Sequence, residues 1–198
     1  MKNNAVDSIL SSSVTGERIE KLIEAYSLLE KEEGDFCRDF SVHCTSSCGE
    51  CCRHYVPYLT EGEAELCAYF LIREGREEEI LSLISSSDEE SGICPLYNPD
   101  KPEHCSFYKG RSMVCRLFGA SVSLDKNGEP AFRDCRWKKD KKVISTAELE
   151  KKMDEVPVMS VYGEALEGEE DGESIYTALP KAVNKIKLLL SYSDSSLS

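Results

Sequence analysis

The chain has 198 residues, ten cysteines and a formal net charge of −13. A chain of this length can bury an ordinary hydrophobic core, so its cysteines are not needed to replace one, as they are in small secreted scaffolds. General binding to nucleic acid or to anionic membranes is not expected, because both depend on clustered positive charge. The charge is unevenly distributed, since residues 101–142 contain eleven Lys or Arg against five Asp or Glu.

The N-terminus lacks the apolar stretch of a signal peptide, and no later segment approaches the roughly 20 apolar residues that span a bilayer. We therefore expect a cytoplasmic protein that does not bind membranes. In a reducing compartment, a dense cysteine set more often binds metal or performs redox chemistry than forms disulfides.

The first predicted element is an amphipathic helix over Glu17–Glu33, where apolar residues recur at helical spacing. Residues 1–16 before it are expected to be flexible. Between Phe36 and Tyr58 the chain contains five cysteines and no sustained period. We expect an irregular loop there, held in place by its ligands.

Two helices are predicted next. Thr60 to Glu63 has the Thr-x-x-Glu form of a capping box, which indicates a helix over Glu61–Arg73. A shorter helix is expected over Glu77–Ile84, and the polar residues 85–92 after it are typical of a surface loop.

The segment between Cys115 and Cys135 contains two extended runs around Asn127-Gly128, a pair that favours a β-hairpin turn with positive φ. The hairpin, over residues 122–132, would bring Cys135 back toward Cys115.

The C-terminal part of the chain predicts two more helices. Ser145 or Thr146 can cap a helix that runs through Met153. Pro180, placed in a first helical turn, predicts a helix over Lys181–Leu190, and residues 191–198 are expected to form a flexible tail.

The cysteines form the strongest functional signal. Four lie within the nine residues CTSSCGECC, and four more follow downstream. Together they are Cys44, Cys48, Cys51, Cys52, Cys94, Cys105, Cys115 and Cys135. Thiolates are soft donors that favour zinc or an iron–sulfur cluster over Mg²⁺ or Ca²⁺, and eight of them suffice for two four-thiolate sites or two clusters.

The vicinal pair, Cys51 and Cys52, adds a constraint. Adjacent side chains in extended backbone point to opposite sides, so the two thiolates would not easily bind one tetrahedral ion. We therefore expect two metals or one polynuclear centre.

Several motifs resemble one family: CTSSCGECC, LTEGEAELC, CPLYN, CSFYKGRSMVCRLFG and the later Cys135. In this combination they are similar to the YkgJ-type cysteine-cluster family, also described as the CxxCxxCC zinc- or iron-chelating domain. The resemblance implies a metal-binding domain whose ligands are the eight cysteines named above. The chain departs from the family at Ser112 and Gly119, where relatives often have proline.

Alternative ligands stay open at this stage. Cys37, or a histidine, could take the place of Cys135. His43, His54 and His104 each neighbour a cysteine, but with eight thiolates present we expect them to be solvated or to support the ligands. Cys67 lies inside a predicted helix and is expected to be a buried apolar side chain.

The sequence thus predicts a mainly α fold with irregular cysteine-rich loops and a small β-hairpin. It would form one compact domain over residues 17–190, organised around a metal site in a cysteine-cluster core at residues 37–142. The function expected is metal binding with a structural or chelating role, with a metal ion as the one predicted partner. No catalytic motif is found.

Two other functions compete with this one. An iron–sulfur cluster could transfer electrons or sense oxidants. Similar cysteine motifs also occur in flagellin lysine N-methylases, which are longer than this chain, and a related enzyme would bind S-adenosylmethionine.

Overall fold

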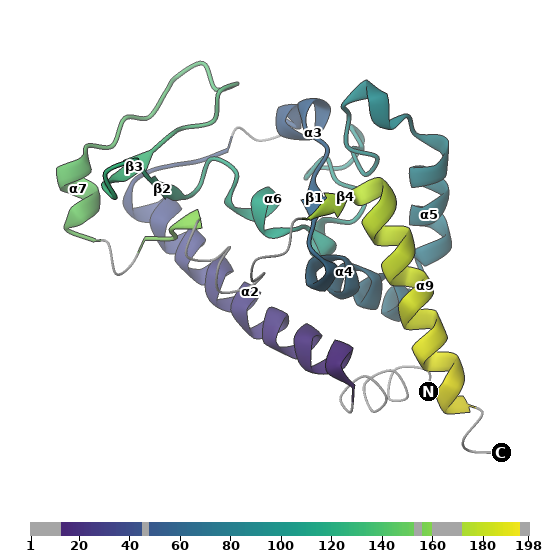
Figure 1. Cartoon of the computed structure of the whole chain (residues 1–198). Coiled ribbons are helices and arrows are strands. Elements are labelled where there is room, and N and C mark those ends of the chain that lie inside the picture. Colours follow the sequence, from purple (N-terminus) through teal and green to yellow (C-terminus); the bar gives the residue numbers. More distant parts are fainter. Residues whose placement is uncertain (1–12, 45–47, 153–155, 160–171, 195–198) are drawn as a thin grey trace.

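The computed structural model describes residues 13–44, 48–152, 156–159 and 172–194. The fold is mainly helical, as the sequence predicts (Figure 1). It contains two small antiparallel sheets, the predicted hairpin and a second sheet formed by Tyr58–Leu59 and Glu173–Ser174, which the sequence does not predict. The principal elements are α2 (Val14–Asp39), α3 (Glu50–His54), β1 (Tyr58–Leu59), α4 (Glu61–Glu74), α5 (Glu77–Ser86), α6 (Met113–Leu117), β2 (Val122–Leu124), β3 (Pro130–Phe132), α7 (Thr146–Glu150), β4 (Glu173–Ser174) and α9 (Ile175–Asp194). Short 3₁₀ turns, η1 (Glu89–Ser91) and η2 (Tyr108–Gly110), lie in the connections.

Helix α2 confirms the first predicted helix but is longer at both ends. Ser13 caps it by accepting a hydrogen bond from the Gly16 N–H at 3.0 Å. The helix continues to Asp39 and therefore includes Cys37. Its inward face buries Ile19, Leu22, Tyr26, Leu29 and Phe36.

Helix α4 confirms the capping box. The Thr60 hydroxyl accepts from the Glu63 N–H at 3.3 Å, and the Glu63 carboxylate accepts from the Thr60 N–H at 3.2 Å. The helix is the centre of the larger core, since α2, α5 and α9 all pack against it. Cys67 is buried there, as expected.

Helix α9 corrects the prediction for the C-terminus. It begins at Ile175, so Pro180 lies inside the helix rather than in its first turn, and it runs on to Asp194. Pro180 lacks the N–H that a helix interior uses, which disfavours this position. Burial of Ile175 and Leu179 against α4 offsets that loss.

The hairpin is present as predicted, with Val122 paired to Phe132 and Leu124 to Pro130. Its turn is closed by Asp125, whose carbonyl accepts from the Gly128 N–H at 3.0 Å. Gly128 has the expected positive φ, +84°. Helix α7 follows with Ser145 as its cap and ends at Glu150, before the predicted end at Met153, which lies outside the described residues.

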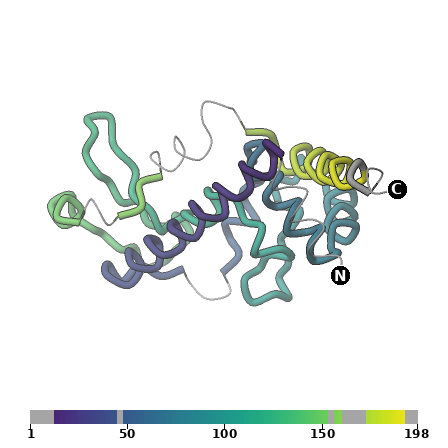
Figure 2. Tube along the Cα trace, turned by 90° about the horizontal axis from the view of Figure 1, so that it is seen from below, coloured from purple at the N-terminus to yellow at the C-terminus, as the bar shows by residue number. Residues whose placement is uncertain are grey.

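The described residues form two hydrophobic cores. The larger one contains α4 and α9 and the inner faces of α2 and α5. The smaller one consists of Phe36, Val42, Val122, Ile144, Leu149 and Val156. Figure 2 shows α2 extending from the helices of the larger core to the part that holds the hairpin and α7, so one helix contributes to both cores. Within the described ranges, no helix has the length and apolar character needed to cross a bilayer.

Candidate metal centre

A cavity of about 360 Å³ lies between the two cores and is lined by side chains of both. Nine of the ten cysteines, all of which the structure describes, line it; they are Cys37, Cys44, Cys48, Cys51, Cys52, Cys94, Cys105, Cys115 and Cys135. None of the ten is joined in a disulfide. Segments far apart in the sequence thus bring the eight predicted cysteines, and Cys37, to one space.

The cysteines reach the cavity from helices as well as from loops. Cys37 lies in α2, Cys51 and Cys52 in the short helix α3, and Cys115 in α6. The expectation of an irregular loop through the whole first cluster is therefore wrong for the vicinal pair. Gly49 comes directly before α3 and has φ of +60°. A residue with a side chain rarely adopts this backbone conformation.

The helical conformation of α3 also removes the argument against a shared ion. The Cys51 and Cys52 sulfurs are 3.9 Å apart. Zinc–sulfur bonds of about 2.3 Å in a tetrahedron place two sulfurs about 3.8 Å apart. In this helical backbone the two side chains do not point to opposite sides, and their sulfur separation is compatible with one shared ion.

Four cysteines influence one another electrostatically on the inner side of the site: Cys52, Cys94, Cys105 and Cys115. Cys94 is buried, and the other three are partly buried. The Cys94 N–H donates to the Cys52 carbonyl at 2.8 Å, which fixes the loop that follows α5 against α3. Burial raises the pKa of Cys94 to about 12 and that of Cys115 to about 11. The charges of Cys94 and Cys115 also contribute to the raised pKa of Cys52, after the hydrogen bond to Cys51 and burial.

Three other predicted ligands act electrostatically on Cys44. Burial raises the pKa of Cys44, and so do the charges of Cys48, Cys51 and Cys135. The hairpin brings Cys135 next to the residues that follow α6, as the sequence predicts. The Cys135 Cβ lies 3.2 Å from the position that a Cβ on Gly119 would take. Gly119 has φ of +73°, which proline cannot adopt, so the departure from the family pattern fits the path of this loop.

Arg111 and Arg116, which flank Cys115, donate to backbone carbonyls, and Arg116 also pairs with Glu30. Arg111 donates to the Cys115 carbonyl at 3.3 Å, and its guanidinium lies 3.6 Å from the centre of the Tyr108 ring. Arg116 donates to the carbonyls of Arg111 and Lys109, each at 2.9 Å. The charge of Arg111 nevertheless lowers the pKa of Cys115, opposing the effect of burial.

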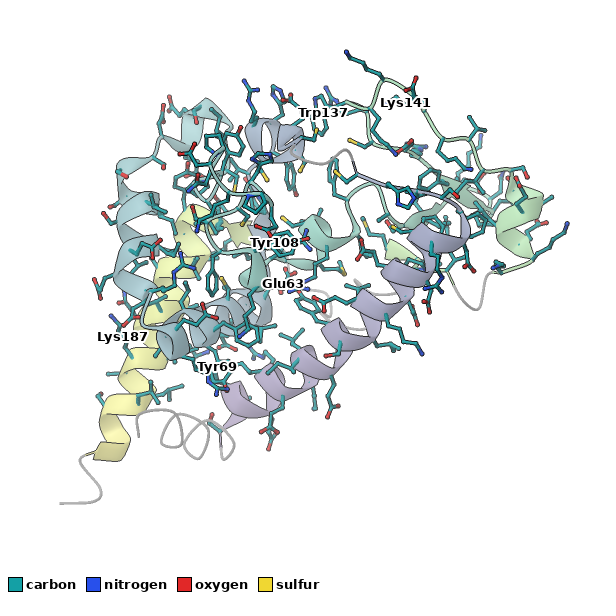
Figure 3. The ribbon with its side chains drawn as sticks, turned by 180° about the vertical axis from the view of Figure 1, so that it is seen from behind. Glu63, Tyr69, Tyr108, Trp137, Lys141 and Lys187 are labelled. Carbon is teal, nitrogen blue, oxygen red and sulfur yellow. The ribbon has the colours of Figure 1, made fainter. Side chains whose placement is uncertain are left out.

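Glu63, which the sequence identifies only as a helix cap, does not line the cavity but anchors a helix that carries one of its cysteines. Its Oε1 accepts hydrogen bonds from the Tyr26 hydroxyl at 2.6 Å and from the Met113 N–H at 2.7 Å. Met113 begins α6, so the carboxylate ties the helix that carries Cys115 to α2 and α4. Figure 3 shows Glu63 in the interior of the molecule.

The three histidines occupy different surroundings. His43 and His104 line the cavity. His54 lies on α3 outside it, exposed and stacked on the Trp137 ring at 5.5 Å between ring centres. Phe118 stacks on Trp137 as well, at 5.7 Å. Figure 3 shows Trp137 near one edge of the molecule.

The donor set fits a thiophilic metal, although its side chains are not arranged around one point. Among the described residues, no three Cys, His, Asp or Glu side chains converge as metal ligands do. Nine thiols nevertheless line one cavity, together with polar nitrogens of His104 and Arg111 that are buried without a hydrogen-bond partner among those residues. Soft sulfur donors in this number suit zinc or iron.

The fold and the cavity define a helical cysteine-cluster protein. A family model described as "CxxCxxCC: Putative zinc- or iron-chelating domain" matches residues 43–157, more than half of the chain. The chain belongs to this family. The matched range includes the eight predicted cysteines and leaves Cys37 outside. No curated protein and no solved structure gives a match to the chain.

Proposed function

We propose that this protein binds zinc, or iron in an iron–sulfur centre, through eight cysteines: Cys44, Cys48, Cys51, Cys52, Cys94, Cys105, Cys115 and Cys135. The observation that carries the proposal is their position around one cavity. The description of the family, zinc- or iron-chelating, supports the same chemistry.

We divide the thiols into two groups of four, the number of ligands in one tetrahedral site. Cys52, Cys94, Cys105 and Cys115 form the inner group, in which Cys94 is buried and the other three are partly buried. Cys44, Cys48, Cys51 and Cys135 form the outer group, in which the charges of the other three thiols raise the pKa of Cys44. The contact of 3.9 Å between Cys51 and Cys52 joins the groups, so two adjacent centres or one shared cluster would fit.

The role we propose for the metal is to hold the fold together. The ligands extend from Cys44 to Cys135, and the segment 92–107, which contains Cys94 and Cys105, forms no helix or strand. A metal bound by distant ligands fixes the segments between them, and these ligands come together only in the folded chain, so folding and metal binding are coupled. Binding also releases thiol protons, and the Arg111 guanidinium favours the resulting thiolates.

The proposed compartment is the cytoplasm, where the reducing environment keeps thiols available for metal.

Anaerobic purification from the native host, followed by elemental analysis and a visible absorption spectrum, tests which metal the cavity holds. Iron with sulfide and a coloured protein identifies an iron–sulfur centre, and zinc in a colourless protein identifies a zinc site. Protein that contains neither metal contradicts the proposal.

Variants test the ligands. Cys51→Ser and Cys115→Ser should each lower the metal content and the melting temperature together. Cys67→Ala is the matched control, because Cys67 is buried in the larger core and does not line the cavity. It should lose some stability through the smaller side chain and keep the wild-type metal content. Unchanged metal stoichiometry in both serine variants would refute the ligand assignment.

A further inference from the structure

His104 is the most unusual polar side chain of the cavity. Both of its ring nitrogens are buried, and neither has a hydrogen-bond partner among the described residues. A neutral imidazole contains one donor and one acceptor, and burying both without partners is unfavourable. Native structures rarely tolerate this unless a bound group satisfies the atoms.

The backbone holds His104 firmly in this position. Its N–H donates to the Lys101 carbonyl at 3.0 Å, and its carbonyl accepts from the Asn98 N–H at 3.1 Å. The residue has φ of +51°, in the left-handed region that residues other than glycine seldom occupy. The loop therefore accepts an unfavourable conformation at the residue immediately before Cys105.

The His104 ring fits against the first cysteine cluster because a glycine, Gly49, stands there. Gly49, between Cys48 and Cys51, lies directly against it: a Cβ on Gly49 would be 3.1 Å from His104 Cγ and 2.8 Å from Tyr97 Cε2. The Tyr97 ring is 6.1 Å from the imidazole, centre to centre. The ring is thus packed between Tyr97 and the CxxC segment, and it lines the same cavity as the nine thiols.

We propose that His104 is a nitrogen ligand of the metal in this cavity, which would give one centre mixed sulfur and nitrogen coordination. The inference rests on the proposed function, since it requires a metal in the cavity. Imidazole nitrogen is a common ligand of zinc and also occurs in iron–sulfur centres. A bound metal would satisfy one of the two buried ring nitrogens.

The other histidines supply matched controls. His54 is only two residues after Cys52, but it is exposed, pairs with Glu50 at 3.3 Å and does not line the cavity. His43 lines the cavity, but it is an exposed residue. Proximity to a cysteine in the sequence therefore does not distinguish the three, whereas burial does.

X-ray absorption at the metal edge tests the proposal, using the full chain as purified with its metal. We expect a metal–sulfur shell with the outer-shell scattering of an imidazole ring in the wild type and in His54→Gln and His43→Gln. The imidazole scattering should be absent from His104→Gln, with metal affinity at least about tenfold lower. His104→Cys, which offers a thiolate in place of nitrogen, should regain affinity and show an increased sulfur shell.

The wild-type spectrum is decisive even if a variant does not fold. A metal bound by sulfur alone would overturn the role of His104 and leave the proposed metal binding intact. Imidazole scattering that persists in His104→Gln or His104→Cys, or that disappears in His43→Gln, would also overturn it. Wild-type protein without metal would refute both this inference and the proposed function.

Discussion

The vicinal cysteines have opposite acidities in spite of their identical chemistry. The contact between their sulfurs lowers the pKa of Cys51 to about 6 and raises that of Cys52, because the proton on Cys52 stabilises a thiolate on Cys51. Arg111 contributes to the lower pKa of Cys51. In the metal-free protein at neutral pH, Cys51 is therefore mostly a thiolate, the form that binds metal.

This difference predicts the order of chemical modification in metal-free, reduced protein. Cys51 should react with iodoacetamide at pH 7.5, since the thiolate is the nucleophile, and its rate should fall as the pH drops through about 6. Cys94, buried and with a pKa of about 12, should not react in the folded protein. Peptide mass spectrometry after labelling from pH 5 to pH 9 measures both. Equal rates at the two sites would contradict the prediction.

The raised pKa values of other thiols predict a loss of stability at high pH. Burial raises the pKa of Cys37 and Cys115 to about 11 and that of Cys94 to about 12, from a usual value of 9.0. Above pH 9 the unfolded chain releases these protons while the folded protein retains them, so rising pH favours unfolding. The urea midpoint of metal-free protein should thus be lower at pH 10.5 than at pH 8. An unchanged or higher midpoint would show that these thiols titrate normally.

Glu63 predicts a structural effect at a distance from the thiols. Glu63→Ala leaves the Met113 N–H and the Tyr26 hydroxyl buried without their acceptor, which should lower the free energy of unfolding by about 3 kcal/mol. Glu61→Ala, two residues earlier on α4, removes only partly exposed ion pairs and should cost about 0–1 kcal/mol. Urea denaturation of both variants measures the contrast, and similar losses would argue against an anchoring role for Glu63.

At the scale of elements, local signals predicted helices well where the signal was complete. The capping box at Thr60 and Glu63 fixed the start of α4 correctly, because both partners are close in sequence. Helix α3 has only five residues, too few to show a helical period, so the sequence predicts a loop there. The predicted start of α9 is wrong because packing against α4 overrides the usual place of Pro180.

Helix α9 therefore depends on its buried face rather than on local signals. Ile186 is fully buried against the larger core, whereas Leu188, on the same helix, is 55% exposed. Ile186→Ala should destabilise the protein by about 2–5 kcal/mol, and Leu188→Ala by no more than about 0.5 kcal/mol. Urea unfolding curves of the two variants check this, and equal midpoints would show that α9 is not anchored by that face.

At the scale of the whole molecule, the cavity lies where two hydrophobic cores meet. Its lining includes Val42 of the smaller core and Leu59, Leu96 and Phe107 of the larger one. Sequence spacing identified eight of the nine cysteines that line it. Sequence reasoning names Cys37 only as an alternative to Cys135 and does not predict the burial of the His104 ring nitrogens, because both depend on how α2 and the loop before Cys105 pack in three dimensions.

This arrangement predicts where metal removal acts. A metal held by ligands from both sides of the cavity would link the smaller core to the larger, so chelation should increase hydrogen exchange most in β2, β3 and α7. Amides of α4 in the larger core should retain more of their protection. Hydrogen exchange followed by mass spectrometry, with and without chelator, measures this. A uniform increase would instead indicate that the two cores unfold together.

The stack of aromatic rings beside the cavity has an optical consequence. Trp137 is the one tryptophan of the chain, and its neighbours are His54 of α3 and Phe118, three residues after Cys115. The fluorophore thus stacks on α3, which carries Cys51 and Cys52, and on the segment that follows Cys115. An iron–sulfur centre absorbs at wavelengths where indole emits and would quench this fluorescence by energy transfer, whereas colourless zinc would not. The protein contains its own reporter of which metal it holds.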